Sequence, residues 1–309
     1  MIRIIRGNAR SKMTQTGSIL LGFIVTSLLG VGSAFGDSGF QFKKYKSYYG
    51  KQFYQSVQGG LRNKELKARL QEILSKKHKP KANDYDEIGS PECEDANSQC
   101  FAHQSIGYEE ARKFLLGKFY LKQIDGEYAV KDVYCNREIL AKEFDSRAKA
   151  PGPNQIPDNR VVNVEHTWPQ SKFTSKHPKE MQKADLHHLF PTDSEINAIR
   201  GNRNFGSVDK DEQTLKCPES RIGLPPAGRE LVFEPPNDHK GNVARALFYF
   251  SVRYGTEINP NEEQTLRAWD KSDPVDDEEI TRNDEIFKVQ GDRNPFVDHP
   301  ELVEVINQF

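Results

Sequence analysis

Apolar residues recur at helical spacing along much of the chain. The spacing predicts helices at 61–75, 105–122, 241–255, 261–270 and 277–290. In the first of these, Leu66, Leu70 and Leu74 mark the inner face, and the pattern stops before a lysine-rich segment. In the third, we expect Asn242 to cap the N-terminus and Gly255 to end the helix.

Alternation of apolar and polar residues predicts two strands, at 127–135 and 161–166. The apolar run at 186–191 has the length of a strand and is the expected partner of the second one. Thr192 or Asp193 is placed to cap the helix that follows. The local order is therefore strand, loop, strand, helix. We expect an α+β fold, mainly helical, with short antiparallel strands.

The first 36 residues differ from the rest of the chain. They carry four basic residues and no acidic one, then an apolar run from Ile19 to Val31, then small residues at Ala34 and Gly36. This order predicts a secretory signal peptide at 1–36. The alternative, a membrane anchor, needs roughly 20 apolar residues, and the run is shorter. We expect a protein that is periplasmic or extracellular and free of the membrane once the signal is cleaved.

Four cysteines follow, which is an even number in a chain expected to be exported, where disulfides persist. No two of them form the closely spaced pair typical of a zinc site. Three pairings are possible. We predict the pairing of Cys93 with Cys100 and of Cys135 with Cys217.

The composition fits a globular protein with a core: of 309 residues, 36% are hydrophobic and 29% are charged. Without residues 1–36, the formal net charge changes from −1 to −5. Within this acidic total, residues 37–82 hold twelve Lys or Arg against three acids. A basic stretch of this kind indicates contact with a polyanion, although a solvated helix face explains it equally well. We expect residues 37–104, a basic helix and a cysteine loop, to pack on a main domain at 105–309.

The stretch "NVEHTWPQ" (163–170) places Glu165 and His166 side by side. Histidine titrates near neutral pH and is the usual general base. The neighbouring carboxylate has a use of its own if it binds a hard cation such as Mg²⁺, and the amide oxygen of Asn197, on the following helix, is a second candidate ligand. Such a site suits hydrolysis of a phosphodiester.

Longer motifs resemble a known family. The segments "EHTWPQSKF", "DLHHLFPTDSEINAIRGN", "EPPNDHKGNVARALFYF" and "DEIFKVQGDRNPFVD" occur in the same order as in the endonuclease I family of secreted bacterial nucleases, and the likeness covers most of residues 48–298. The resemblance implies a ββα-metal (His-Me finger) core within a catalytic domain at 105–309. It places the general base on His166 and the ligands of Mg²⁺, or of Mn²⁺ or Ca²⁺ in its place, on Glu165 and Asn197.

The resemblance also indicates substrate-binding residues. Arg200 matches a family arginine expected near the substrate phosphate, and Arg203 is a second candidate, unless it only closes the helix. The family arginine between the two strands has no counterpart, because that segment is shorter here; Lys172 or Lys176 is the expected replacement. We expect His187 to support the site from the second strand rather than to bind metal.

Two functions remain open. The first is a secreted, monomeric, metal-dependent endonuclease that acts on DNA and, in a broader form of the prediction, also on RNA. We expect little sequence preference, because the sequence shows no base-reading module. The second is an inactive or accessory nucleic-acid-binding protein that uses the basic stretch. The presence of Glu165, His166 and Asn197 together favours the enzyme.

Overall fold

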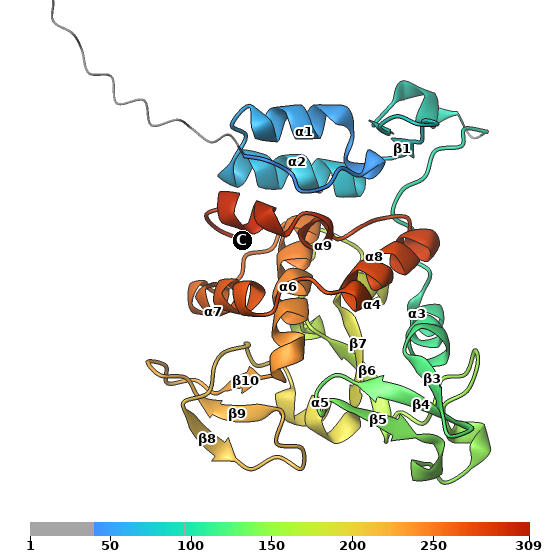
Figure 1. Ribbon diagram of the computed structural model, residues 1–309, viewed down its shortest axis with the longest axis vertical. Coiled ribbons are helices and arrows are strands. Elements are labelled where there is room, and N and C mark those ends of the chain that lie inside the picture. Colours follow the sequence, from blue (N-terminus) through green and yellow to red (C-terminus); the bar gives the residue numbers. More distant parts are fainter. Residues whose placement is uncertain (1–39, 96) are drawn as a thin grey trace, which may run out of the picture. The chain divides into compact units, whose positions relative to one another are not determined.

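Helix α6 (Lys240–Tyr254) is the element around which other helices pack (Figure 1). The computed structural model describes residues 40–95 and 97–309, so the signal peptide predicted at 1–36 lies outside the described residues. Nearly every residue of α6 is buried, which agrees with its apolar pattern on several sides. The helix ends at Gly255 in the left-handed conformation, as predicted.

The other helices surround α6 or flank the short sheets. They are α1 (Lys51–Gln58), α2 (Asn63–Ser75), α3 (Tyr108–Phe114), α4 (Lys179–Ala184), α5 (Ser194–Arg200), α7 (Pro260–Ser272), α8 (Asp277–Gln290) and α9 (Pro295–Asp298). The helices predicted at 61–75, 261–270 and 277–290 are confirmed. Within the described residues, no helix has the length and apolar character needed to cross a membrane.

The helix expected at 105–122 is confirmed over its central part: α3 ends at Phe114 and continues as a wider, π-helical turn at Leu115–Phe119, in which the carbonyl of Gly117 accepts a hydrogen bond from the backbone N–H of Asn154 (2.9 Å). One prediction about a helix end is wrong. Asn242 does not cap α6, which begins two residues earlier. The N–H of Gly241 instead donates to the carboxylate of Asp273 (2.8 Å), so the cap comes from the end of α7.

The strands form four small antiparallel sheets. They are β1 (His78–Lys79) with β2 (Glu87–Ile88); β3 (Leu121–Ile124), β4 (Glu127–Asp132) and β5 (Arg137–Leu140); β6 (Val162–His166) with β7 (Leu189–Asp193); and β8 (Lys210–Gln213), β9 (Arg221–Leu224) and β10 (Val232–Glu234). The β6–β7 pair leads directly into α5, whose N-terminus is capped by Asp193, as predicted. This ββα unit within a mainly helical chain confirms the α+β fold.

The second strand begins later than predicted. Residues 186–188 form a 3₁₀ turn, and β7 starts only at Leu189. The carboxylate of Asp185 accepts a hydrogen bond from the N–H of His187 and so caps the turn. From α8, the guanidinium of Arg282 donates to the carbonyls of Leu186 and Leu189. Contacts from a distant helix therefore replace the expected strand geometry.

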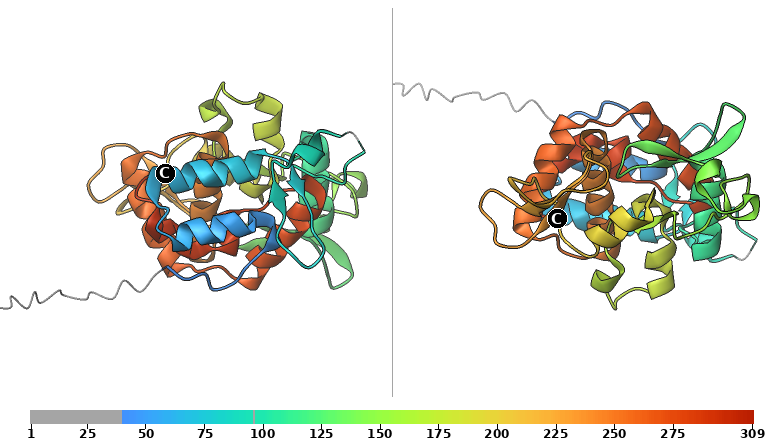
Figure 2. Two further views of the ribbon diagram at one scale, coloured as in Figure 1. Left: turned by 90° about the horizontal axis from the view of Figure 1, so that it is seen from above. Right: turned by 90° about the horizontal axis from the view of Figure 1, so that it is seen from below.

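The basic N-terminal region packs on the rest of the described chain. Helices α1 and α2 run side by side, and α2 lies against α6 (Figures 1 and 2). Several lysines of the basic N-terminal region pair with nearby acids: Lys76 with Glu72, Lys79 with Glu92, and Lys81 with Glu87. These ion pairs support the alternative of a solvated, charge-balanced face. Contact of this region with a polyanion stays a prediction.

Both predicted disulfides are present and differ in the length of chain that they close. Cys93 and Cys100 are seven residues apart, whereas Cys135 and Cys217 are 82 residues apart. Restricting the unfolded chain stabilises by about 2.5 kcal/mol for the short loop and about 4.5 kcal/mol for the long one. The second disulfide also joins β4 and the following turn to the segment after β8.

We therefore expect the double variant Cys135→Ser/Cys217→Ser to lose more stability than Cys93→Ser/Cys100→Ser. The measurement is the free energy of unfolding by denaturant titration of each variant without reductant. Equal losses in the two variants would show that loop length does not decide the effect.

Candidate active site

A cavity of about 440 Å³ lies where the ββα unit meets α3 and the loop after β6. Four predicted site residues line it together: the predicted base His166, the predicted ligands Glu165 and Asn197, and Arg200. Glu165 and His166 are the last two residues of β6. They contact different neighbours, as strand alternation requires, and both reach the cavity because it lies at the end of the strand.

The ring of His166 is held in one orientation. Its Nε2 lies 3.0 Å from the carbonyl oxygen of Lys183, and because a carbonyl only accepts, Nε2 carries the proton. The remaining nitrogen, Nδ1, receives the amide N–H of Gln170 at 3.3 Å. Burial, and then the proximity of His188, lower the pKa of His166 to about 3. The ring is therefore neutral at neutral pH, with its lone pair on Nδ1.

Glu165 is buried, with 3% of its surface exposed. Its Oε1 accepts a hydrogen bond from the hydroxyl of Tyr134 (3.0 Å) and lies 2.7 Å from a terminal nitrogen of Arg200. Burial raises the pKa of Glu165, while the charge of Arg200 and the bond from Tyr134 act in the opposite direction. Both partners make their closest contact with the same oxygen, Oε1, so lone pairs of Oε2 are left for a further ligand.

Asn197 has a similar free oxygen. Its Nδ2 donates to the side-chain oxygen of Asn163 (2.7 Å), which leaves its own Oδ1 without a hydrogen bond in the described part of the chain. One carboxylate oxygen and one amide oxygen thus border the same cavity with lone pairs available. Oxygen donors of these types suit Mg²⁺, which keeps several waters and binds through few protein ligands. The donor set therefore fits a divalent cation.

The predicted substrate-binding residues separate into two groups. Arg200 lines the cavity but is buried, and its terminal nitrogens donate to the carbonyls of His166 (3.1 Å) and Thr167 (2.8 Å). Neither Arg203 nor Lys172 lines it: Arg203 donates to the carbonyl of Ile199 at the end of α5, as in the helix-closing alternative. Lys172 bonds Asn204 beside another cavity. Direct phosphate contact by these three residues stays a prediction.

The histidine beside His166 is His188 rather than the expected His187. The rings of His166 and His188 are 5.5 Å apart, and His188 is fully buried with Nε2 donating to the carbonyl of Gln182 (2.7 Å). His187 packs on Tyr249 and faces Asp292 instead. The structure thus places His188 and not His187 beside His166, because the 3₁₀ turn does not follow strand alternation; a supporting role for His187 stays a prediction.

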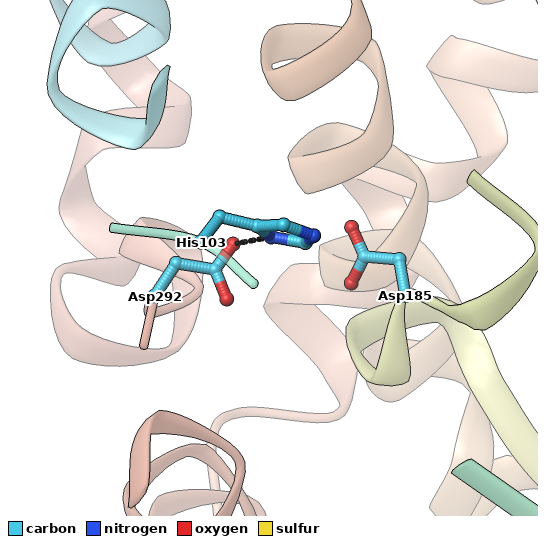
Figure 3. A group of neighbouring side chains, drawn as sticks. All are labelled: His103, Asp185 and Asp292. Carbon is cyan, nitrogen blue, oxygen red and sulfur yellow. Dashed lines mark hydrogen bonds and ion pairs between the residues drawn. The ribbon is translucent and has the colours of Figure 1, made fainter. Parts of the chain in front are cut away.

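A second cluster of charged side chains lies away from the cavity. Figure 3 shows the imidazole of His103 between the carboxylates of Asp185 and Asp292, with Nδ1 2.8 Å from Asp292. These carboxylates already accept hydrogen bonds from Tyr249 and Gln290. Burial is the largest single effect and opposes protonation of His103, but the charge of Asp292, its hydrogen bond and the charge of Asp185 together outweigh burial and raise the pKa of His103. The geometry of this three-residue cluster alone would also suit a metal ion. The carboxylate oxygens already accept hydrogen bonds, however, and this favours a buried ion pair.

We expect His103→Gln to destabilise the fold by roughly 3–5 kcal/mol, the usual result of leaving a buried charge without its partner. Because the folded pKa lies above the unfolded one, the stabilisation by His103 is complete below about pH 6.5 and is lost as the pH rises through the folded pKa. Denaturant titrations of wild type and variant at acidic and alkaline pH measure this. A difference between the two proteins that is the same at both pH values would contradict a charged His103.

Some residues of the site have weak sequence signals or none. Asn163 lies two positions before Glu165 on β6, so a polar residue at this spacing in an apolar strand was a usable signal. Tyr134, which holds Glu165, follows β4 and gives no local sign of this role. Tyr108 and Arg112 reach the cavity from α3. Their helical spacing indicated only an amphipathic helix.

Comparison with known proteins identifies the family of this chain. The family described as Endonuclease I matches residues 95–301. The extracellular ribonuclease of Bacillus subtilis (strain 168) is 36% identical over an alignment of 192 residues, which covers 55% of this chain and 62% of that protein. The extracellular ribonuclease of Bacillus amyloliquefaciens is 34% identical, over 55% of this chain and 61% of its own length.

A relative with a different named activity matches a shorter region. An extracellular deoxyribonuclease of Aeromonas hydrophila is 34% identical over 118 residues, which are 38% of this chain and 49% of that protein. This chain thus spans about three-fifths of the length of the two Bacillus relatives and about half of the Aeromonas one.

Proposed function

This chain belongs to the endonuclease I family, and from that premise we propose that it is an exported, metal-dependent endonuclease that hydrolyses phosphodiester bonds. The observation that carries the proposal is the meeting of three groups in one cavity. These are the neutral imidazole of His166, whose acceptor nitrogen Nδ1 is bonded only by the side-chain amide of Gln170, the carboxylate of Glu165 and the amide oxygen of Asn197.

In this proposal His166 is the general base. The carbonyl of Lys183 holds the ring by Nε2, so Nδ1 takes the proton from an attacking water. Arg200 positions the site: it bonds the backbone carbonyl of His166 and pairs with Glu165, and so links the Glu165 side chain to the backbone at His166. Glu165 and Asn197 would hold a divalent cation, with Mg²⁺ as the expected ion. When bound, such an ion neutralises charge that develops on the phosphate oxygens.

The proposed substrates are DNA and RNA. Relatives named as ribonucleases and as a deoxyribonuclease support both. Base-specific reading is not expected, because the site residues are suited to phosphate chemistry rather than to base edges. Export is proposed from the predicted signal peptide and from the extracellular names of these relatives. A monomer remains the expected state.

A cleavage assay with and without EDTA tests the proposal. We expect the exported protein to nick and linearise supercoiled plasmid, and to degrade a single-stranded RNA, in Mg²⁺. EDTA should stop both reactions, and excess Mg²⁺ should restore them. Cleavage that continues in EDTA would contradict the metal assignment. Binding of DNA without cleavage in Mg²⁺, Mn²⁺ or Ca²⁺ would instead support the accessory binding protein.

A further inference from the structure

The cavity holds few cations that are free to meet a phosphate. Among the described residues that line it, Arg112 and Arg200 are the basic ones. Arg200 is 1% exposed, and both of its terminal nitrogens already bond carbonyls or Glu165. Its Nε has no partner but is buried, so Arg200 presents little donor surface to a substrate anion. Arg112 is therefore the lining residue to consider.

Arg112 has no partner of its own. Within residues 40–95 and 97–309, its side chain takes part in no hydrogen bond or ion pair, and its Nε is buried without a partner. The carboxylates on the same helix, Glu109 and Glu110, pair with Lys113 instead. An arginine carries five N–H donors, and leaving a buried one unsatisfied is costly. The side chain is thus poised for an anion that enters the cavity.

Packing holds Arg112 close to the proposed base. Its guanidinium lies over the ring of Tyr108, 5.1 Å from the ring centre, one helical turn away on α3. The same ring lies 5.4 Å from the ring of His166. Lys183, whose carbonyl orients His166, places its ammonium 4.8 Å from the Tyr108 ring. Tyr108 therefore connects the position of Arg112 to that of the imidazole.

We propose that Arg112 binds a non-bridging oxygen of the substrate phosphate in this cavity. Helix α3, which lies outside the ββα unit, would then supply the phosphate-binding cation that we expected from the shortened segment between β6 and β7. A planar guanidinium matches two phosphate oxygens, so it also fixes the orientation of the phosphate. This inference rests on the proposed nuclease function, because that function supplies the phosphate.

The test compares Arg112→Ala, Arg112→Lys and a matched control, Lys113→Ala. Lys113 is the next residue on α3 and does not line the cavity, so the control removes the same charge from the same helix. Single-turnover cleavage of plasmid in Mg²⁺ measures the reaction, filter binding in Ca²⁺ over a range of salt measures phosphate contacts, and melting curves check the fold.

We expect Arg112→Ala to slow single-turnover cleavage about 10²–10³-fold, the usual effect of removing one donor to a developing anion. Its binding should depend less on salt, with a slope reduced by about one. Arg112→Lys should keep the salt slope but recover only part of the rate, because an ammonium cannot bind two oxygens at once. Lys113→Ala should resemble wild type in rate and in melting temperature.

Two results would overturn the inference. The first is a cleavage rate of Arg112→Ala equal to that of wild type, and the second is a loss of cleavage rate in Lys113→Ala as large as in Arg112→Ala. Failure of the proposed function looks different, because then wild type itself would not cleave. In that case a reduced salt slope in Arg112→Ala would still support phosphate binding by Arg112, and an unchanged slope would reject it.

Discussion

Replacement of His166 by alanine is expected to lower cleavage by about 10²–10⁴-fold, the usual contribution of a positioned general base. Nucleic-acid binding should persist, because Glu165, Asn197 and Arg112 remain in the cavity. The ring is already neutral when buried, so its removal takes away a proton acceptor and not a positive charge. Single-turnover cleavage of plasmid in Mg²⁺, beside filter binding in Ca²⁺, separates the two effects.

Gln170→Ala is the matched control for this variant. Gln170 lines the same cavity and donates to Nδ1 of His166, but it has no basic atom of its own. Its removal should change the rate far less than removal of the imidazole. A cleavage rate of His166→Ala equal to that of wild type would show that His166 is not the base. A loss of cleavage rate in Gln170→Ala as large as in His166→Ala would argue against the assignment in the same way.

Replacement of Glu165 by glutamine should lower both the cleavage rate and the stability of the fold. It removes the charged ligand of the proposed cation, whose stabilisation of the reacting phosphate is several kcal/mol, or roughly 10²–10³-fold in rate. The Mg²⁺ concentration that gives half-maximal cleavage should rise. Melting temperature should also fall, because Arg200 is buried and loses the charge of its partner.

Asn197→Ala separates these two consequences. It removes an amide oxygen from the cavity, but within the described residues the Asn197 side chain forms no hydrogen bond with Glu165 or Arg200. We expect a shifted Mg²⁺ requirement with a melting temperature close to that of wild type. The measurements are Mg²⁺ titrations of cleavage and melting curves for both variants. Mg²⁺ titrations that superimpose on wild type in both variants would reject the ligand assignment.

The sequence by itself determined the features that depend on short stretches of chain. Helical spacing located α2, α7 and α8, because burial of one face leaves a periodic record in the residues themselves. Asp193 was recognisable as a cap, because a cap bonds the backbone two or three residues away. The adjacent Glu165 and His166 were visible as candidate chemistry for the same reason: the motif is local.

Only the tertiary structure decided which of two adjacent histidines lies beside His166. The 3₁₀ turn at 186–188 is held by Arg282 from α8, nearly a hundred residues away, and no local pattern encodes that contact. From the sequence, Arg112 is only one residue of an amphipathic helix. Its place in the cavity follows from the packing of α3 near the end of β6. The physical reason is the same in both cases: side-chain roles here depend on packing between segments distant in sequence, whereas periodicity records only burial within one segment.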